Sequence, residues 1–127
     1  MKIRLIAFYS LFLGISVIIS WIMILISQEI PEGPIEFSLH LISELLMALL
    51  CLISGVLLIR NHRISVYICI AGHAMAIYSL LNAAGYYLQR DERALPGLFL
   101  ILLVLSLLTL YYLLRKAPIL DKKETHR

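Results

Sequence analysis

The chain has 127 residues, of which 61% are hydrophobic and 15% are charged, and its formal net charge is +3. Soluble domains are about 45–50% apolar and about 25% charged, so this composition excludes an ordinary soluble domain. The two cysteines form no Cys-x-x-Cys pair and the basic residues sit at the ends of apolar runs, which indicates no disulfide framework, no zinc site and no nucleic-acid partner.

Four apolar runs are long enough to cross a bilayer, because a hydrocarbon core of about 30 Å needs roughly 20 residues per helix. They cover about residues 5–26, 37–59, 64–88 and 95–114. The sequence therefore predicts an all-α integral membrane four-helix bundle with short loops. We expect residues 1–116 to form this domain and residues 117–127 to form a polar cytoplasmic tail.

The first run is predicted to be a retained helix and not a cleaved signal peptide. Lys2 and Arg4 resemble the start of a signal peptide. However, the apolar stretch exceeds the usual length of about 7–15 residues, and no A-x-A-like cleavage site follows Ser27. Its aromatic residues Tyr9 and Trp21 are expected in the interfacial aromatic belts.

Lysine and arginine are distributed unequally between the two ends of the predicted bundle. Only Arg90 and Arg93 lie on one side, in a loop that also carries acidic residues. The other nine basic residues are Lys2, Arg4, Arg60, Arg63, Arg115, Lys116, Lys122, Lys123 and Arg127. Cytoplasmic loops are enriched in Lys and Arg, so both termini are predicted to be cytoplasmic, in a plasma membrane of the prokaryotic type.

Glu44 is the most unusual residue of the second run. It is the one formally charged residue between positions 37 and 59, and His40 precedes it by one helical turn. A carboxylate in lipid costs roughly 2.5–3.5 kcal/mol on insertion scales. Protonation, pairing or access to water must offset this cost. Because intramembrane ionisable groups usually mark functional sites, Glu44 indicates such a site.

The third run is predicted to bring further polar side chains to the depth of Glu44. A rise of about 1.5 Å per residue puts His40 roughly 5 Å and Glu44 roughly 10–12 Å below the outer boundary. The third run passes in the opposite direction, so Asn82 and Tyr78 are level with Glu44, and Tyr86 is level with His40. We expect these five residues to form a polar pocket that opens outward and binds a ligand or proton.

His73 is predicted to be a second buried polar group, apart from this pocket. It lies roughly 22 Å below the outer boundary and on the opposite side of its helix from Asn82. Its offset from His40, roughly 16 Å along the membrane normal, disfavours one haem held by both histidines. The sequence assigns no cofactor, and Cys51 and Cys69 are expected to be packing residues.

Three functions remain open for the pocket. The first is binding or transport of a small cationic or amphipathic ligand, with Glu44 as charge partner and proton acceptor. The second is a membrane enzyme for a lipid-like substrate, with His40 and Glu44 as an acid/base pair or as metal ligands, although metal sites usually use three or four ligands. The third is a structural or accessory subunit. Expected partners are membrane lipids and the ligand. Transport would need a homo-oligomer, because four short helices leave little room for a pathway.

Overall fold

The computed structural model describes residues 3–27, 33–89 and 94–124, and their side chains as far as residue 117. Its elements are four helices: α1 (Ile3–Ser27), α2 (Pro34–Ile59), α3 (Ser65–Leu88) and α4 (Ala94–Glu124). All four are long and apolar enough to cross a membrane. The predicted all-α, four-helix architecture is therefore confirmed.

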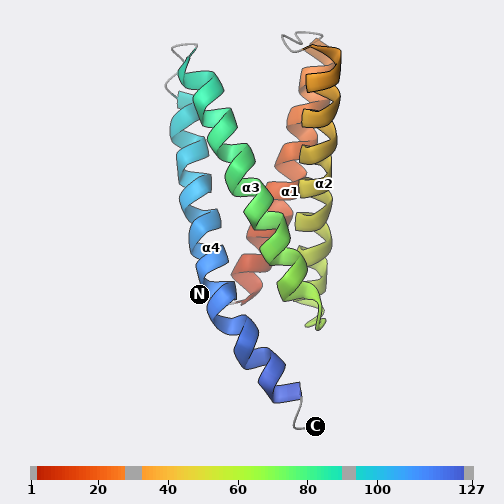
Figure 1. The fold of residues 1–127 in the computed structure, drawn as a ribbon, viewed down its shortest axis with the longest axis vertical. Coiled ribbons are helices and arrows are strands. Elements are labelled where there is room, and N and C mark those ends of the chain that lie inside the picture. The colour runs from red at the N-terminus through yellow and green to blue at the C-terminus, as the bar shows by residue number, and fades with distance from the viewer. Residues whose placement is uncertain (1–2, 28–32, 90–93, 125–127) are drawn as a thin grey trace.

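The helices form two antiparallel hairpins, α1–α2 and α3–α4, which are joined mainly by contact between α2 and α3 (Figure 1). In this view the hairpins cross near their middle and diverge toward the C-terminal end of α1 and the N-terminal end of α4. The beginning of α1, the connection between α2 and α3, and the end of α4 lie at the opposite end. The bundle thus has two distinct ends.

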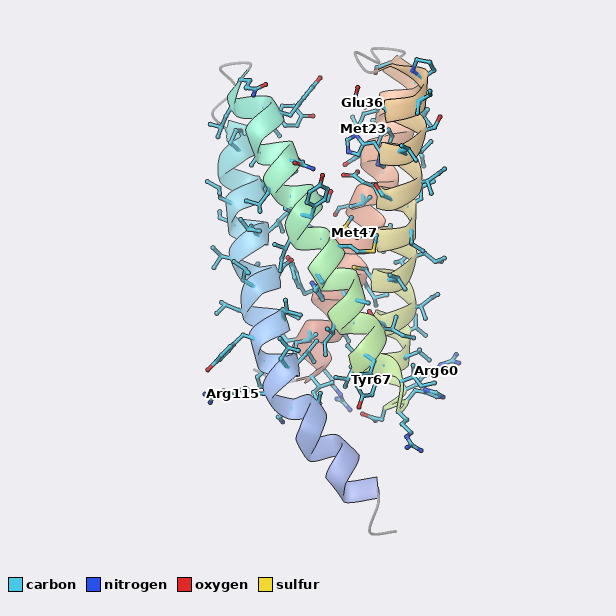
Figure 2. All side chains as sticks on the ribbon, in the orientation of Figure 1. Met23, Glu36, Met47, Arg60, Tyr67 and Arg115 are labelled. Carbon is cyan, nitrogen blue, oxygen red and sulfur yellow. The ribbon has the colours of Figure 1, made fainter. Side chains whose placement is uncertain are left out.

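Charge distinguishes these ends. Figure 2 shows Arg60 and Arg115 at the end that carries the α2–α3 connection, and Glu36 at the other end. Near the basic end, Arg115 lies over the ring of Tyr111 and Lys116 over the ring of Tyr112, at 5.1 and 5.2 Å from the ring centroids. The basic residues whose positions are described therefore gather at one end of the bundle.

Helices α1 and α2 pack closely because each presents a glycine to the other. A Cβ added at Gly14 would lie 2.9 Å from the Ala48 carbonyl oxygen, and one added at Gly55 would lie 3.0 Å from the Ala7 carbonyl oxygen. Small residues allow helix backbones to approach in this way, which favours helix association in lipid. These two contacts set the register of the first hairpin.

Helix α2 ends in a Schellman motif that reverses the chain. The Asn61 N–H donates to the Leu58 carbonyl at 3.2 Å, and the His62 N–H donates to the Leu57 carbonyl at 2.9 Å. Asn61 has a φ of 52°, in the left-handed region that asparagine tolerates better than most residues. The Ser65 hydroxyl then donates to the His62 carbonyl at 2.6 Å, at the start of α3.

Helix α4 is longer than the membrane span predicted for it. The predicted span ends near residue 114, where Arg115 and Lys116 follow, but the helix continues to Glu124. Main-chain hydrogen bonds within a helix do not require apolar side chains, so a helix can extend past the bilayer boundary. The polar tail predicted at 117–127 therefore begins as a helix.

Candidate functional site

The Glu44 carboxylate interacts with three helices. Trp21 in α1 donates its indole N–H to Oε2 at 2.6 Å, and the Ser79 hydroxyl in α3 donates to Oε1. His40, in the same helix as Glu44, places Nε2 3.2 Å from Oε1. The Glu44 side chain is only 16% exposed. Its hydrogen bonds therefore join α1, α2 and α3.

Local structure explains how these groups meet. His40 and Glu44 are four residues apart, so they share one face of α2. The antiparallel register of α1 and α2 brings Trp21 level with them. The Trp21 ring is buried and meets Phe37 and His40 edge-on, with centroid distances of 5.7 and 5.3 Å. The carboxylate thus contacts an aromatic cluster that joins α1 and α2 through Trp21 and His40.

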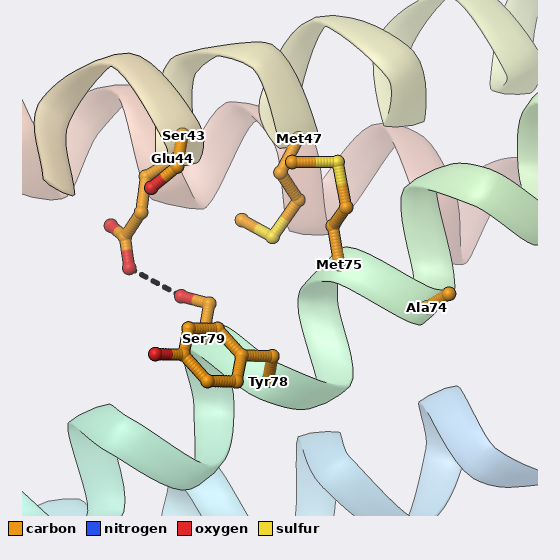
Figure 3. A pocket seen from close by; sticks show the side chains of 7 residues that line it. All are labelled: Ser43, Glu44, Met47, Ala74, Met75, Tyr78 and Ser79. Carbon is orange, nitrogen blue, oxygen red and sulfur yellow. Dashed lines mark hydrogen bonds between the residues drawn. The ribbon is translucent and has the colours of Figure 1, made fainter. Parts of the chain in front are cut away.

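A pocket of about 380 Å³ lies on the other side of the carboxylate, between α2 and α3 (Figure 3). Its volume lies within the usual range for small-molecule sites. Met47 is 2% exposed and Tyr78 is 70% exposed, so the pocket has an apolar buried side and an open side. The lining residues are Ser43, Glu44, Met47, Ala74, Met75, Tyr78 and Ser79.

The structure brings together some of the residues that the sequence places at this site. Glu44 and Tyr78 line the pocket, and His40 contacts Glu44 from outside the lining. Asn82 is exposed on the outside of α3 and does not line the pocket. Tyr86 does not line it either and meets Tyr87 edge-on at 5.2 Å.

The sequence predicts Asn82 beside Glu44 because the two residues are level and because Asn82 shares a helix face with Tyr78. Ser79, which forms that contact, is three residues earlier, so the two differ by roughly 4.5 Å in height and by about 60° around the helix. Counting residues estimates the height well. It does not give the rotation of α3 about its own axis.

Trp21 and Ser79 are the site residues that sequence reasoning missed. The sequence predicts an interfacial position for Trp21. The depth count, extended to the first run, puts it roughly 8 Å below the outer boundary, close to Glu44. That signal could have identified it. Ser79 carried no comparable signal, because a single serine in a helix most often bonds to its own backbone.

A second polar cluster surrounds His73, nearer the basic end. His73 is fully buried, and its Nε2 lies 3.0 Å from the Ser10 hydroxyl. Its ring stacks on Tyr9 at 5.4 Å, and the Tyr9 hydroxyl donates to the Leu102 carbonyl at 2.7 Å and lies 2.8 Å from the Ser106 hydroxyl. This cluster joins α1, α3 and α4, and the His73 Nδ1 has no hydrogen-bond partner among the described residues.

The arrangement around Glu44 suits charge and hydrogen-bond recognition better than metal binding. In the part of the chain that the structure describes, no three His, Cys, Asp or Glu side chains converge. His40 and Glu44 supply two such groups. A carboxylate offers about four acceptor positions, so the three contacts leave Glu44 with one for a ligand.

Comparisons with known proteins identify a family and give no function. No curated protein and no solved structure matches the chain at a significant level. One family model matches residues 1–126, which is nearly the whole chain. The chain therefore belongs to the family described as Domain of unknown function (DUF8058).

Proposed function

We propose that this protein is an integral membrane protein that binds or transports a small cationic or amphipathic ligand in the Glu44 pocket. Transport would need an oligomer and would be coupled to protons. One observation carries the proposal. The Glu44 carboxylate lines a pocket of about 380 Å³ between two helices of membrane-spanning length, and no lysine or arginine of the described residues pairs with it.

The chemistry of the lining supports a ligand with both charge and apolar surface. The carboxylate would attract a cation, and attraction between charges is strong where water is scarce. The Tyr78 ring can stack against a cationic group, and the flexible thioethers of Met47 and Met75 can adapt to an apolar body. Ser43, on the α2 side of the pocket, is exposed on the side of the bundle, which supports entry from the bilayer.

Proton coupling follows from competition at one group. A cation and a proton would bind the same carboxylate, so each would lower the affinity for the other. Binding of the cation would therefore weaken as the pH is lowered.

The distribution of basic residues supports a location and an orientation. Arg60, Arg63 and Arg115 are exposed at the end of the bundle where α1 begins and α4 ends. In a plasma membrane of the prokaryotic type, the positive-inside rule would place this end in the cytoplasm. The Glu44 pocket would then lie in the outer half of the membrane.

The test is binding of the lipophilic cation tetraphenylphosphonium to the purified protein in lipid nanodiscs, from mildly acidic to mildly alkaline pH. Glu44→Gln should remove the pH-dependent binding. Glu36→Gln is the matched control, because Glu36 is exposed in the first turn of the same helix, away from the pocket. Binding by Glu44→Gln with unchanged affinity and pH dependence would refute the proposal.

Two other functions have some support. The three-helix network around Glu44 also suits a structural or accessory subunit, in which Glu44→Gln would reduce stability and no separate activity would be lost. The 3.2 Å contact between His40 and Glu44 suits an acid/base pair of an enzyme for a lipid-like substrate. That enzyme would lose turnover in His40→Ala.

A further inference from the structure

Helix α3 has an exposed face that differs from the rest of the surface. Its residues recur at steps of three and four, so at 100° per residue they fall within an arc of about 80°. We call these residues the α3 outer face: Ala71, Ala74, Tyr78, Asn82 and Gly85, all exposed. Exposed side chains elsewhere in the four spans are mainly Leu, Ile, Phe and Val, which lipid accommodates without a partner.

Asn82 shows that this face needs a partner. Its carboxamide is exposed near the middle of the outer half of α3. No hydrogen bond of this carboxamide is formed within the described residues. A polar group facing hydrocarbon without a partner is costly, and lipid tails cannot supply one. A carboxamide is both donor and acceptor, so two copies of Asn82 related by a twofold axis can satisfy each other.

Gly85 shows that the face has room for a close neighbour. A Cβ added at Gly14, Gly55 or Gly72 would meet another helix of the same chain at 2.8, 2.6 or 3.2 Å. One added at Gly85 would meet nothing within 4 Å. The fold of one chain therefore does not use this glycine for close packing, and the backbone of a second chain could approach there.

We propose that the α3 outer face binds the same face of a second copy of this chain, and that the second copy completes the Glu44 pocket. Ala74 and Tyr78 belong both to this face and to the pocket lining. A helix packed on the face would cover the α3 side of the pocket opening and bury the Tyr78 ring, while the α2 side at Ser43 would stay open. The inference rests on the membrane placement and on the pocket described under the proposed function.

Disulfide crosslinking in native membranes tests which face meets which. Asn82→Cys should form a crosslinked dimer on mild oxidation, since Asn82 would meet its copy at the axis. Ile42→Cys is the matched control, because Ile42 is at a similar depth and exposed on α2. The native Cys51 and Cys69 are buried and do not compete. Equal crosslinking of the two variants would overturn the proposal.

A second measurement follows the dimer without introduced cysteines. The mass of the complex released from nanodiscs should correspond to two chains. Asn82→Leu should weaken the dimer about tenfold, as expected for loss of interhelical hydrogen bonds in lipid. Gly85→Leu should abolish the dimer, whereas Gly97→Leu should leave it unchanged, because Gly97 has the same open space but lies on α4.

The outcomes separate this proposal from the proposed function. The dimer proposal is refuted if the wild-type chain is monomeric, or if a different protein is bound to this face. If that chain still binds tetraphenylphosphonium through Glu44, the proposed function stands alone. A dimer that responds to Asn82→Leu and Gly85→Leu but binds no cation supports the interface and contradicts the proposed function.

Discussion

Replacing Trp21 by phenylalanine should weaken the connection between α1 and α2. The substitution keeps an aromatic ring near Phe37 and His40 but removes the indole N–H that donates to Glu44 at 2.6 Å. Phenylalanine is smaller than tryptophan, so the loss of stability would combine a packing effect with a hydrogen-bond effect. A double-mutant cycle with Glu44→Leu isolates the interaction between the two side chains.

The structure sets the expected size of this coupling. Interhelical hydrogen bonds measured in a membrane protein average about 0.6 kcal/mol and reach about 1.7 kcal/mol. Hydrogen bonds to charged groups in proteins contribute about 1.5–3 kcal/mol. The bond to Glu44 is short and the side chain is largely buried, but Ser79 and His40 also contact the carboxylate. We therefore expect a coupling of roughly 1–2 kcal/mol between Trp21 and Glu44.

The measurement is reversible unfolding in mixed micelles of a mild detergent and sodium dodecyl sulfate. Helix content must be followed by circular dichroism, because Trp21 is the only tryptophan and its fluorescence is lost in the variant. Glu36→Gln is the control partner for Trp21→Phe, since Glu36 is exposed and the two effects should add within about 0.3–0.5 kcal/mol.

A coupling below about 0.3 kcal/mol between Trp21→Phe and Glu44→Leu would show that the bond contributes nothing beyond additivity, and would refute the reasoning. The cycle also bears on function. A large coupling together with unchanged cation binding in Glu44→Gln would favour the structural role. A small coupling together with lost cation binding would favour the ligand site.

Three further predictions concern the packing and the chain reversal, and the same unfolding measurement checks each. Gly14→Ala should lower the free energy of unfolding by roughly 1–3 kcal/mol, because the added methyl group meets the Ala48 carbonyl oxygen, while Gly97→Ala should not destabilise the fold. Equal effects at the two glycines would contradict the close packing of α1 on α2. Asn61→Gly should preserve the free energy of unfolding. Asn61→Val should lower it by about 1–2 kcal/mol, because the positive φ at this position disfavours a branched side chain. An Asn61→Val variant with unchanged stability would exclude the left-handed cap. Tyr9→Phe should cost about 0.5–1.5 kcal/mol by removing the hydroxyl that bonds to α4, and no loss would show that this bond is not formed.

The number and approximate limits of the helices were predictable because they depend on local properties. A run of about 20 apolar residues spans a bilayer whatever its neighbours are. The contact between His40 and Glu44 was predictable for the same reason, because residues four apart in one helix share a face. The length of α4 was not predictable from hydropathy, since the helix continues through the charged residues that follow Leu114.

The remaining partners of Glu44 depended on tertiary structure. The sequence by itself determined that a carboxylate lies among apolar residues, roughly two turns inside the second span. Only the packed helices decided that Trp21 and Ser79 contact it and that Asn82 faces outward. Depth follows from a rise of about 1.5 Å per residue, whereas the face that each helix turns inward depends on how small and large side chains fit between helices. That fit involves all four helices, so no single segment of the sequence contains it.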